Sequence, residues 1–286
     1  MTVASVGQRP SSSDDERALP PARGETAPLG TAGDTGPARS GPRGAAAGPL
    51  LPGVGAAAAL TLGGGRKEAC AGDLVIAGLT RMSSCDWPGR LVATVFLQGC
   101  PWRCTYCHNH AILDPRAPGQ VPWREVRELL TRRAGLLDGV VFSGGEPTRQ
   151  TALADAMREV RDRGFGVGLH TGGAYPRKLE ALLPLVDWIG FDVKAPRHLY
   201  RAITRVGGET TAADQAFASL RMVLDSGVDV QVRTTVDPTV LSNDDVRALT
   251  ATLHDLGVAD HVLQEVRPDG TTTEYQQALA ATRHPS

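Results

Sequence analysis

The sequence predicts an α/β fold, either a partial (β/α)6 barrel or an open doubly wound sheet. After about residue 73, six short apolar runs alternate with amphipathic helical patterns, as in parallel βαβ units. Residues 71–286 fall short of the length of about 250 residues that a complete eight-fold barrel typically needs. In either architecture, chemistry gathers at the carboxyl ends of the strands.

The expected strands and helices follow one another in order. The strands are residues 91–98, 140–143, 166–171, 188–193, 228–236 and 261–266. The helical patterns cover residues 123–133, 151–163, 176–183, 214–226 and 244–256. The last of these helices follows Ser242, a good N-cap residue, and ends before Gly257, a residue typical of helix ends.

The first quarter of the chain has a different composition from the rest. Half of residues 1–70 are Gly, Ala or Pro, and the first aromatic residue of the chain is Trp87. Such a segment cannot bury enough apolar surface to offset the entropy cost of ordering it. We therefore expect residues 1–70 to be a disordered leader and residues 71–286 to be the folded domain. The leader is interpreted as a passive extension, with an overlong start-site assignment as the alternative.

Charge and cysteine usage limit the protein class. The chain has 30 Lys+Arg against 31 Asp+Glu, which does not favour a nucleic-acid-binding protein. The longest apolar stretch, residues 50–62, is shorter than the about 20 residues of a membrane-spanning helix, so no membrane is expected. Five Cys, three of them within eight residues, do not suggest a secreted disulfide framework. We expect a cytoplasmic protein whose thiolates are available for metal.

The cysteine cluster is the most informative stretch. Cys100, Cys104 and Cys107 directly follow the first expected strand, where one loop can wrap around a metal centre. Structural zinc uses four ligands and ordinary iron–sulfur clusters use four Cys, whereas a three-Cys cluster leaves one iron open. Zinc with His108 or His110 as the fourth ligand is the alternative. The spacing indicates a metal site without choosing the metal.

Two further motifs follow later strands. Residues 144–147 read Gly-Gly-Glu-Pro, in which the glycines allow a ligand to approach the backbone and the carboxylate suits an amino group. At the end of the strand 188–193, Asp192 and Lys194 point to one face and Val193 to the other. A surface ion pair is the alternative interpretation of Asp192 and Lys194.

Together these motifs resemble a known family. The Cys-x3-Cys-x2-Cys spacing, with Tyr106 before the third Cys, resembles the signature of the radical S-adenosylmethionine (SAM) enzymes. Residues 86–90 (Asp-Trp-Pro-Gly-Arg), 96–100 (Phe-Leu-Gln-Gly-Cys) and 107–109 (Cys-His-Asn) resemble the anaerobic ribonucleoside-triphosphate reductase activating proteins, which are glycyl-radical-enzyme activases. The resemblance runs from about residue 76 to residue 268.

The resemblance implies a reaction and its cofactors. Cys100, Cys104 and Cys107 would hold a [4Fe–4S] cluster whose open iron is chelated by SAM, with flavodoxin or ferredoxin as electron donor. Reductive cleavage of SAM gives methionine and a 5′-deoxyadenosyl radical, which abstracts hydrogen from a glycine of the partner, anaerobic ribonucleoside-triphosphate reductase. The alternatives are a pyruvate formate-lyase-type activase, a 7-carboxy-7-deazaguanine synthase-like enzyme and, from another class, a structural zinc module.

The resemblance also assigns contacts to SAM. The Gly-Gly-Glu-Pro motif would bind the methionine amino group, Lys194 would meet the SAM carboxylate beside Asp192, and Arg233 would face the cofactor. Gln264 fits a polar contact from the last strand, although a half-exposed strand residue is the simpler account. The residues expected to contact the cofactors are Tyr106, His108, Gly144, Gly145, Glu146, Pro147, Thr171, Asp192, Lys194, Arg233 and Gln264.

One stretch departs from the family pattern. Residues 170–173 read His-Thr-Gly-Gly, where similar activases commonly show Asp or a similar residue and then Thr-Asn-Gly. Thr171 still offers its hydroxyl and backbone, but Gly172 removes a side-chain amide and His170 replaces a carboxylate. The departure puts in doubt a bound monovalent cation of the kind that some relatives use, and it warns of an altered substrate preference.

Overall fold

A computed structural model describes residues 69–206 and 211–283. The described residues contain one seven-stranded sheet whose strands are paired in the order of the chain, β1 to β7. The strands are β1 (Ile76–Ser83), β2 (Val92–Leu97), β3 (Gly139–Gly144), β4 (Gly166–Thr171), β5 (Trp188–Asp192), β6 (Asp229–Val236) and β7 (His261–Glu265). Strands β2 to β7 pair in parallel, whereas β1 runs antiparallel to β2. The partial α/β barrel predicted from the sequence is confirmed.

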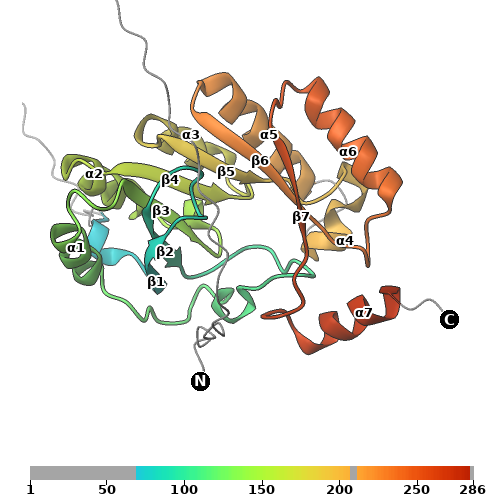
Figure 1. Ribbon diagram of the computed structural model, residues 1–286, viewed down its shortest axis with the longest axis horizontal. Helices are drawn as coiled ribbons and strands as arrows, with labels where there is room; N and C mark the ends of the chain where they lie inside the picture. The colour runs from blue at the N-terminus through green and yellow to red at the C-terminus, as the bar shows by residue number, and fades with distance from the viewer. Residues whose placement is uncertain (1–68, 207–210, 284–286) are drawn as a thin grey trace, which may run out of the picture. The chain divides into compact units, whose positions relative to one another are not determined.

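Helices α1 to α6 lie in the connections between the parallel strands, along one side of the curved sheet, and α7 follows the last strand (Figure 1). They are α1 (Trp123–Arg132), α2 (Leu153–Asp162), α3 (Pro176–Leu182), α4 (Tyr200–Thr204), α5 (Thr211–Ser226), α6 (Asn243–Asp255) and α7 (Thr273–Arg283). In α1, burial of Trp123, Val126 and Leu130 follows the helical repeat, which is why this segment packs as a helix. Ser242 caps α6 through a capping box with Asp245, as expected.

Three elements were not predicted. Strand β1 is irregular, with shifts in its pairing after Ile76 and before Ser83, so its sequence lacks a clean two-residue alternation. Helix α4 is too short to give a periodic pattern. Helix α7 buries mainly Tyr275 and Leu279 in a polar sequence. The sheet therefore has one antiparallel edge strand beyond the six predicted strands.

The amino-terminal ends of the central strands close around an aromatic pair. Trp87 stacks on Trp188 with ring centroids 5.6 Å apart. A β-carbon at Gly139, Gly166 or Gly168 would approach the Trp87 ring to 3.2, 3.3 and 2.9 Å, so these strands carry glycine where the indole lies. The Trp87 ring thus fills this end of the barrel, whereas the preceding residue, Asp86, lines the cavity of the site.

Two expectations concern features at the limits of the described residues. The predicted leader, residues 1–70, lies outside the described residues apart from its last two positions, and its boundary with the folded domain stays a prediction. Across residues 69–206 and 211–283, every helix is too short or too polar to cross a bilayer.

Candidate active site

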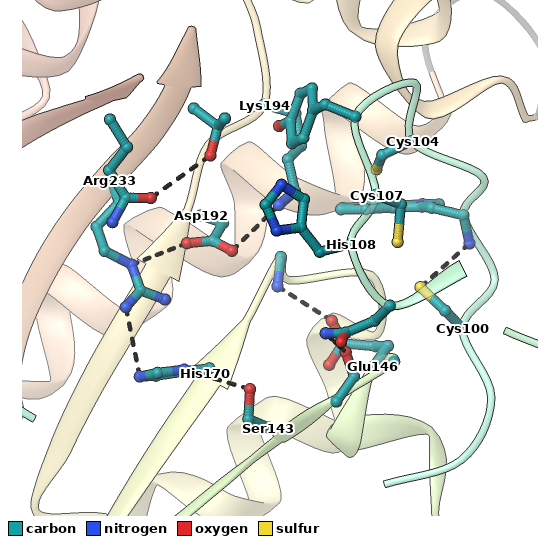
Figure 2. A pocket seen from close by; sticks show the side chains of 18 of the residues that line it. Cys100, Cys104, Cys107, His108, Ser143, Glu146, His170, Asp192, Lys194 and Arg233 are labelled. Atoms are coloured by element: carbon teal, nitrogen blue, oxygen red, sulfur yellow. Dashed lines mark hydrogen bonds and ion pairs between the residues drawn. The ribbon is translucent and has the colours of Figure 1, made fainter. Parts of the chain in front are cut away.

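The carboxyl ends of the parallel strands surround a cavity of about 930 Å³. Figure 2 shows the thiols of Cys100, Cys104 and Cys107 on one side of it, with Asp192 and Arg233 on the other. The predicted site residues that line it are Cys100, Cys104, Tyr106, Cys107, His108, Gly144, Gly145, Glu146, Thr171, Asp192, Lys194, Arg233 and Gln264. Pro147 is buried at the start of a short 3-10 helix and does not line the cavity.

The three cysteines lie on residues 98–109, called here the Cys loop, which follows β2. Main-chain hydrogen bonds fasten this loop before the first thiol and between the first two: Gly99 N–H donates to Ile112 O over 2.8 Å, and Arg103 N–H donates to Thr204 O over 2.8 Å. Thr105 N–H donates to Ile203 O over 3.0 Å. The loop is therefore held in place by the backbone of its neighbours.

Burial changes the acidity of the three thiols. It raises the pKa of Cys100 to about 12 and that of Cys104 to about 11, and it raises the pKa of Cys107 as well. Thiols in this state are protonated at neutral pH, and metal binding must displace their protons. In the described part of the chain, no three His, Cys, Asp or Glu side chains form a group that could hold a single metal ion.

Gly144, which ends β3, and Gly145, which follows it, pack against the end of β2 and the start of the Cys loop. Gly144 has φ +113°, and a β-carbon there would overlap the backbone of Leu97. A β-carbon on Gly145 would overlap the Gly99 carbonyl. The expectation that these glycines leave room for a ligand is therefore incomplete, because the space beside their α-carbons is filled by β2 and the Cys loop.

Glu146 is a buried carboxylate that joins the ends of β3 and β4. Its Oε1 accepts hydrogen bonds from the Thr148 and Thr171 hydroxyls (2.6 and 2.8 Å) and from Thr148 N–H (3.1 Å), and its Oε2 accepts one from Gly172 N–H (3.0 Å). Burial raises the pKa of Glu146, while these four hydrogen bonds oppose the rise. The geometry shows Glu146 fixing the strand ends from which Thr171 faces the cavity.

Asp192 joins two cationic side chains on the other side of the cavity. Its Oδ2 lies 3.1 Å from Lys194 Nζ, and its Oδ1 lies 2.9 Å from Arg233 Nε. Burial favours the neutral acid, but Arg233 and Lys194 together hold the pKa of Asp192 well below its usual value. The Lys194 and Arg233 side chains are only 14% and 11% exposed, so this is not a solvated surface pair. The cluster carries two positive charges for one negative charge.

Tyr106 has an unused hydroxyl. Its side chain is buried, and its oxygen is the single buried side-chain polar atom of the described residues that has no hydrogen-bond partner. Lys194 Nζ lies 5.9 Å from the centre of its ring. Burying a hydroxyl without a partner is unfavourable, so this oxygen lowers the stability of the folded protein.

His170 occupies the floor of the cavity as a neutral imidazole. Burial, with the charge of Arg233 adding to it, lowers the pKa of His170 to about 4. Its Nε2 lies 2.7 Å from Asp86 O and its Nδ1 lies 3.3 Å from the Ser143 hydroxyl. The neutral tautomer with hydrogen on Nε2 satisfies both contacts, so His170 links the β1–β2 loop to β3 and β4.

Gly172, where similar activases commonly have Asn, packs against a side chain of the Cys loop. A β-carbon on Gly172 would overlap the ring of Trp102, which is buried between Cys100 and Cys104. The Trp102 ring also meets the Tyr200 ring edge to face, with centroids 5.9 Å apart. The indole of Trp102 therefore occupies the space that a larger residue at position 172 would need.

The remaining predicted residues lie at the rim. His108 Nε2 lies 3.0 Å from Arg267 O, and Gln264 is exposed beside Thr235. Sequence reasoning missed Asn109, whose side-chain amide donates to Gly144 O over 3.1 Å. The sequence feature that could have identified Asn109 is the Cys-His-Asn stretch at residues 107–109, which the sequence analysis relates only to the family resemblance.

Comparison with known families decides the identity of this site. The model of the radical SAM superfamily matches residues 94–256, which include the three cysteines and strands β3 to β6. The chain belongs to the radical SAM superfamily. Members of this superfamily are enzymes that use a [4Fe–4S] cluster and SAM, so the predicted enzyme class and cofactors are confirmed.

Two curated relatives agree with the predicted resemblance to glycyl-radical-enzyme activases. The chain is 29% identical over 200 residues to a Methanocaldococcus jannaschii protein that carries the name of a glycyl-radical enzyme activating enzyme, covering 68% of this chain and 80% of the relative. It is 30% identical over 184 residues to the pyruvate formate-lyase-activating enzyme of Clostridium pasteurianum, covering 61% and 74%. A structure of Streptococcus suis SuiB bound to S-adenosylmethionine matches with a TM-score of 0.49 at 13% identity, covering 63% of this chain and 40% of SuiB.

The residues around the cavity of this radical SAM enzyme fit both cofactors. Three soft thiol ligands line one wall, which suits an iron–sulfur cluster. Lys194, whose side chain is 14% exposed, lines the same cavity, and its ammonium suits a carboxylate-bearing ligand. The donor set and its surroundings thus match a cluster with SAM beside it.

Proposed function

We propose that this radical SAM enzyme forms a glycyl radical on anaerobic ribonucleoside-triphosphate reductase. The observation that carries the proposal is one cavity shared by three thiols and by the Asp192–Lys194–Arg233 cluster at the carboxyl ends of the strands. The names of the two curated relatives support an activase. The reductase as target is supported by the resemblance of residues 86–90 and 107–109 to its activating proteins.

The side chains around the cavity have separate tasks. Cys100, Cys104 and Cys107 would hold the cluster. When bound, the cluster and SAM supply a 5′-deoxyadenosyl radical that abstracts a hydrogen atom. Lys194 would place its ammonium against the SAM carboxylate, and Asp192 keeps that ammonium charged and directed.

A second target, pyruvate formate-lyase, is favoured by one specific observation. The Clostridium pasteurianum relative, 30% identical across three-quarters of its length, carries the name of the activating enzyme for that protein. The fold and the cavity described above serve either target equally. The two targets differ only in which protein presents the glycine.

For the same reaction we propose flavodoxin or ferredoxin as the electron donor and the cytoplasm as the location. A single-electron donor is required because the reaction begins with one-electron reduction. A reducing compartment keeps the three cysteines available as ligands.

Electron paramagnetic resonance tests the function and the target together. Reconstituted enzyme is mixed anaerobically with SAM, a reductant and either the reductase or pyruvate formate-lyase of the same host. A glycyl doublet on the reductase that is absent with Cys104→Ala supports the proposal, and a doublet on pyruvate formate-lyase alone moves the function to the second target. 5′-Deoxyadenosine without a doublet on either protein rejects both targets while keeping the radical chemistry.

A further inference from the structure

Two contacts fasten the end of the described chain to the Cys loop. At the first, His108 Nε2 lies 3.0 Å from the carbonyl oxygen of Arg267, a residue 159 positions further along the chain. At the second, the buried carboxylate of Asp237 joins Thr105 of the Cys loop to Tyr275 of α7. Residues 266–283, called here the C-terminal segment, therefore meet the Cys loop at two separate places.

Asp237 is the centre of the second contact and is fully buried after β6. Its Oδ2 accepts the Thr105 hydroxyl at 2.5 Å, and its Oδ1 accepts the Tyr275 hydroxyl at 2.8 Å. The same Oδ1 accepts the backbone N–H and the hydroxyl of Thr239 at 2.9 and 2.7 Å. A buried carboxylate is tolerated only when hydrogen bonds replace its hydration, so these four donors belong to one cooperative network.

Thr105 places this network next to the site. It stands directly between Cys104, a predicted cluster ligand, and Tyr106, which lines the cavity. Its backbone N–H donates to Ile203 O over 3.0 Å, so backbone and side chain are held from different directions. A shift of Thr105 must displace both neighbours, because they share its backbone.

Tyr275 is a dependable donor to Asp237. Its side chain is 2% exposed on α7, where Leu279 is buried to the same degree. Burial, reinforced by the Asp237 carboxylate, raises the pKa of Tyr275 well above its usual value. The hydroxyl therefore keeps its proton at neutral pH and can donate it to the Asp237 carboxylate.

We propose that Asp237 is a positioning residue through which α7 fixes Thr105, and thereby Cys104 and Tyr106, within the active site. Asp237 does not line the cavity and touches neither thiols nor predicted SAM contacts. The proposal rests on the cluster-binding role of the Cys loop and holds whichever protein carries the glycine.

The test removes each hydroxyl of the network in the full-length protein. Tyr275→Phe and Thr105→Val each delete one hydrogen bond to Asp237, and Thr105→Ser keeps the hydroxyl. Thr252→Val is the matched control, because the Thr252 hydroxyl bonds only to Ala248 O within α6. Hydrogen exchange by mass spectrometry on apoprotein then compares the peptide of residues 100–107 with that of residues 153–171.

We expect exchange in residues 100–107 to accelerate about three- to tenfold in Tyr275→Phe and Thr105→Val, the factor that one net hydrogen bond represents. Thr105→Ser and Thr252→Val should match the wild type. In reconstituted protein, the resonance of the reduced cluster with SAM should shift or broaden in the first two variants and return to the wild-type shape in Thr105→Ser.

Three results would overturn the positioning role. One is unchanged exchange and an unchanged cluster resonance in both Tyr275→Phe and Thr105→Val. Another is Thr105→Ser behaving like Thr105→Val, which would remove the hydroxyl from the explanation. The third is an equal acceleration of hydrogen exchange in residues 153–171, which would mean that the network stabilises the whole fold and does not specifically position the Cys loop. Because apoprotein exchange needs no partner enzyme, these results are independent of any failure to form a glycyl radical.

Discussion

The guanidinium of Arg233 lies directly over Gly190. A β-carbon at position 190 would stand 2.8 Å from the guanidinium carbon and from both of its terminal nitrogens. From this position Arg233 donates to Gly190 O over 3.3 Å and to Asp192 over 2.9 Å. Because Gly190 of β5 has no side chain, Arg233 of β6 can reach the Asp192 carboxylate.

Gly190→Ala should therefore disturb the site without unfolding the protein, since the atoms that must move are the end of a flexible side chain. We expect SAM affinity of the reconstituted enzyme, measured by calorimetry, to fall about tenfold, or about 1.4 kcal/mol. Gly78→Ala is the matched control, because a β-carbon there meets nothing within 4 Å. Equal SAM affinity in the two variants would contradict this role of Gly190.

Tyr106→Phe should separate stability from binding. Its hydroxyl has no partner, so we expect the free energy of unfolding of the apoprotein to stay unchanged or to rise by about 1 kcal/mol. SAM affinity should stay close to that of the wild type, because the hydroxyl oxygen is buried and is not open to the cavity. Urea unfolding and calorimetry measure the two quantities.

Tyr200→Phe provides the contrast for Tyr106→Phe. The Tyr200 hydroxyl accepts a hydrogen bond from Lys194 N–H over 3.3 Å, so its removal should destabilise the apoprotein by about 1 kcal/mol. If Tyr106→Phe destabilises the apoprotein as much as Tyr200→Phe does, the Tyr106 hydroxyl has a partner and this interpretation is wrong.

His170 should make stability depend on pH in the acidic range. The pKa of His170 is lowered to about 4 in the folded protein, against about 6.5 for an unfolded histidine. The folded state therefore binds fewer protons, and the stability from neutral His170 is present above pH 6.5 and lost as pH falls towards 4. We expect a loss of about 3 kcal/mol across this range that His170→Asn does not show. Urea unfolding of both apoproteins at pH 7, 5.5 and 4 measures it, and a difference that stays constant with pH would refute it.

Asp192→Asn should be strongly destabilising, because it leaves Lys194 and Arg233 buried without their shared anion. Breaking a buried pair costs about 3 to 5 kcal/mol, whereas an exposed pair contributes about 1 kcal/mol or less. Asp155→Asn, which breaks the half-exposed pair with Arg158, is the control. Urea unfolding should show a much larger loss for Asp192→Asn, and equal losses would mean that the Asp192 cluster is solvated.

Gly172 and Trp102 should show energetic coupling. Gly172→Ala forces its β-carbon into the Trp102 ring and should cost about 1 to 3 kcal/mol, as overpacking does. In the background of Trp102→Leu, which makes room, the same change should cost less. A double-mutant cycle by urea unfolding measures the coupling, and strictly additive effects would show that the two sites are independent.

The regular elements could be read from the sequence because local patterns set them. The boundaries of β4 were predicted to the residue, and those of β5 and of α6 to within one residue. The alternation Asp192-Val193-Lys194 correctly placed two charges on the cavity side and a buried valine behind them. The Cys spacing was likewise a local signal, which is why the thiol cluster was found.

The features that the sequence analysis did not predict are contacts between segments that lie far apart in the chain. The Trp102 ring leaves no space for a β-carbon at position 172 only because the Cys loop crosses the end of β4. The Asp237 network likewise joins residues 132 positions apart. The irregular β1 had no clean alternation of its own and is defined mainly by its pairing with β2. Such contacts are properties of the folded chain and leave no periodic trace in the sequence.

The strictly sequential pairing of β1 to β7 has a consequence for how the protein is made. Each strand meets a partner that has already been synthesised, so the sheet can grow by addition at one edge. The Cys loop is synthesised early in this order. Asp237, which binds Thr105, lies 132 positions later in the chain, and Tyr275, which binds Asp237, lies another 38 positions later. The Cys loop is thus translated early, but the side-chain hydrogen bonds that link it through Asp237 to α7 form late. The hydrogen-bond network that joins Thr105 to α7 can therefore form only after Tyr275 has been synthesised.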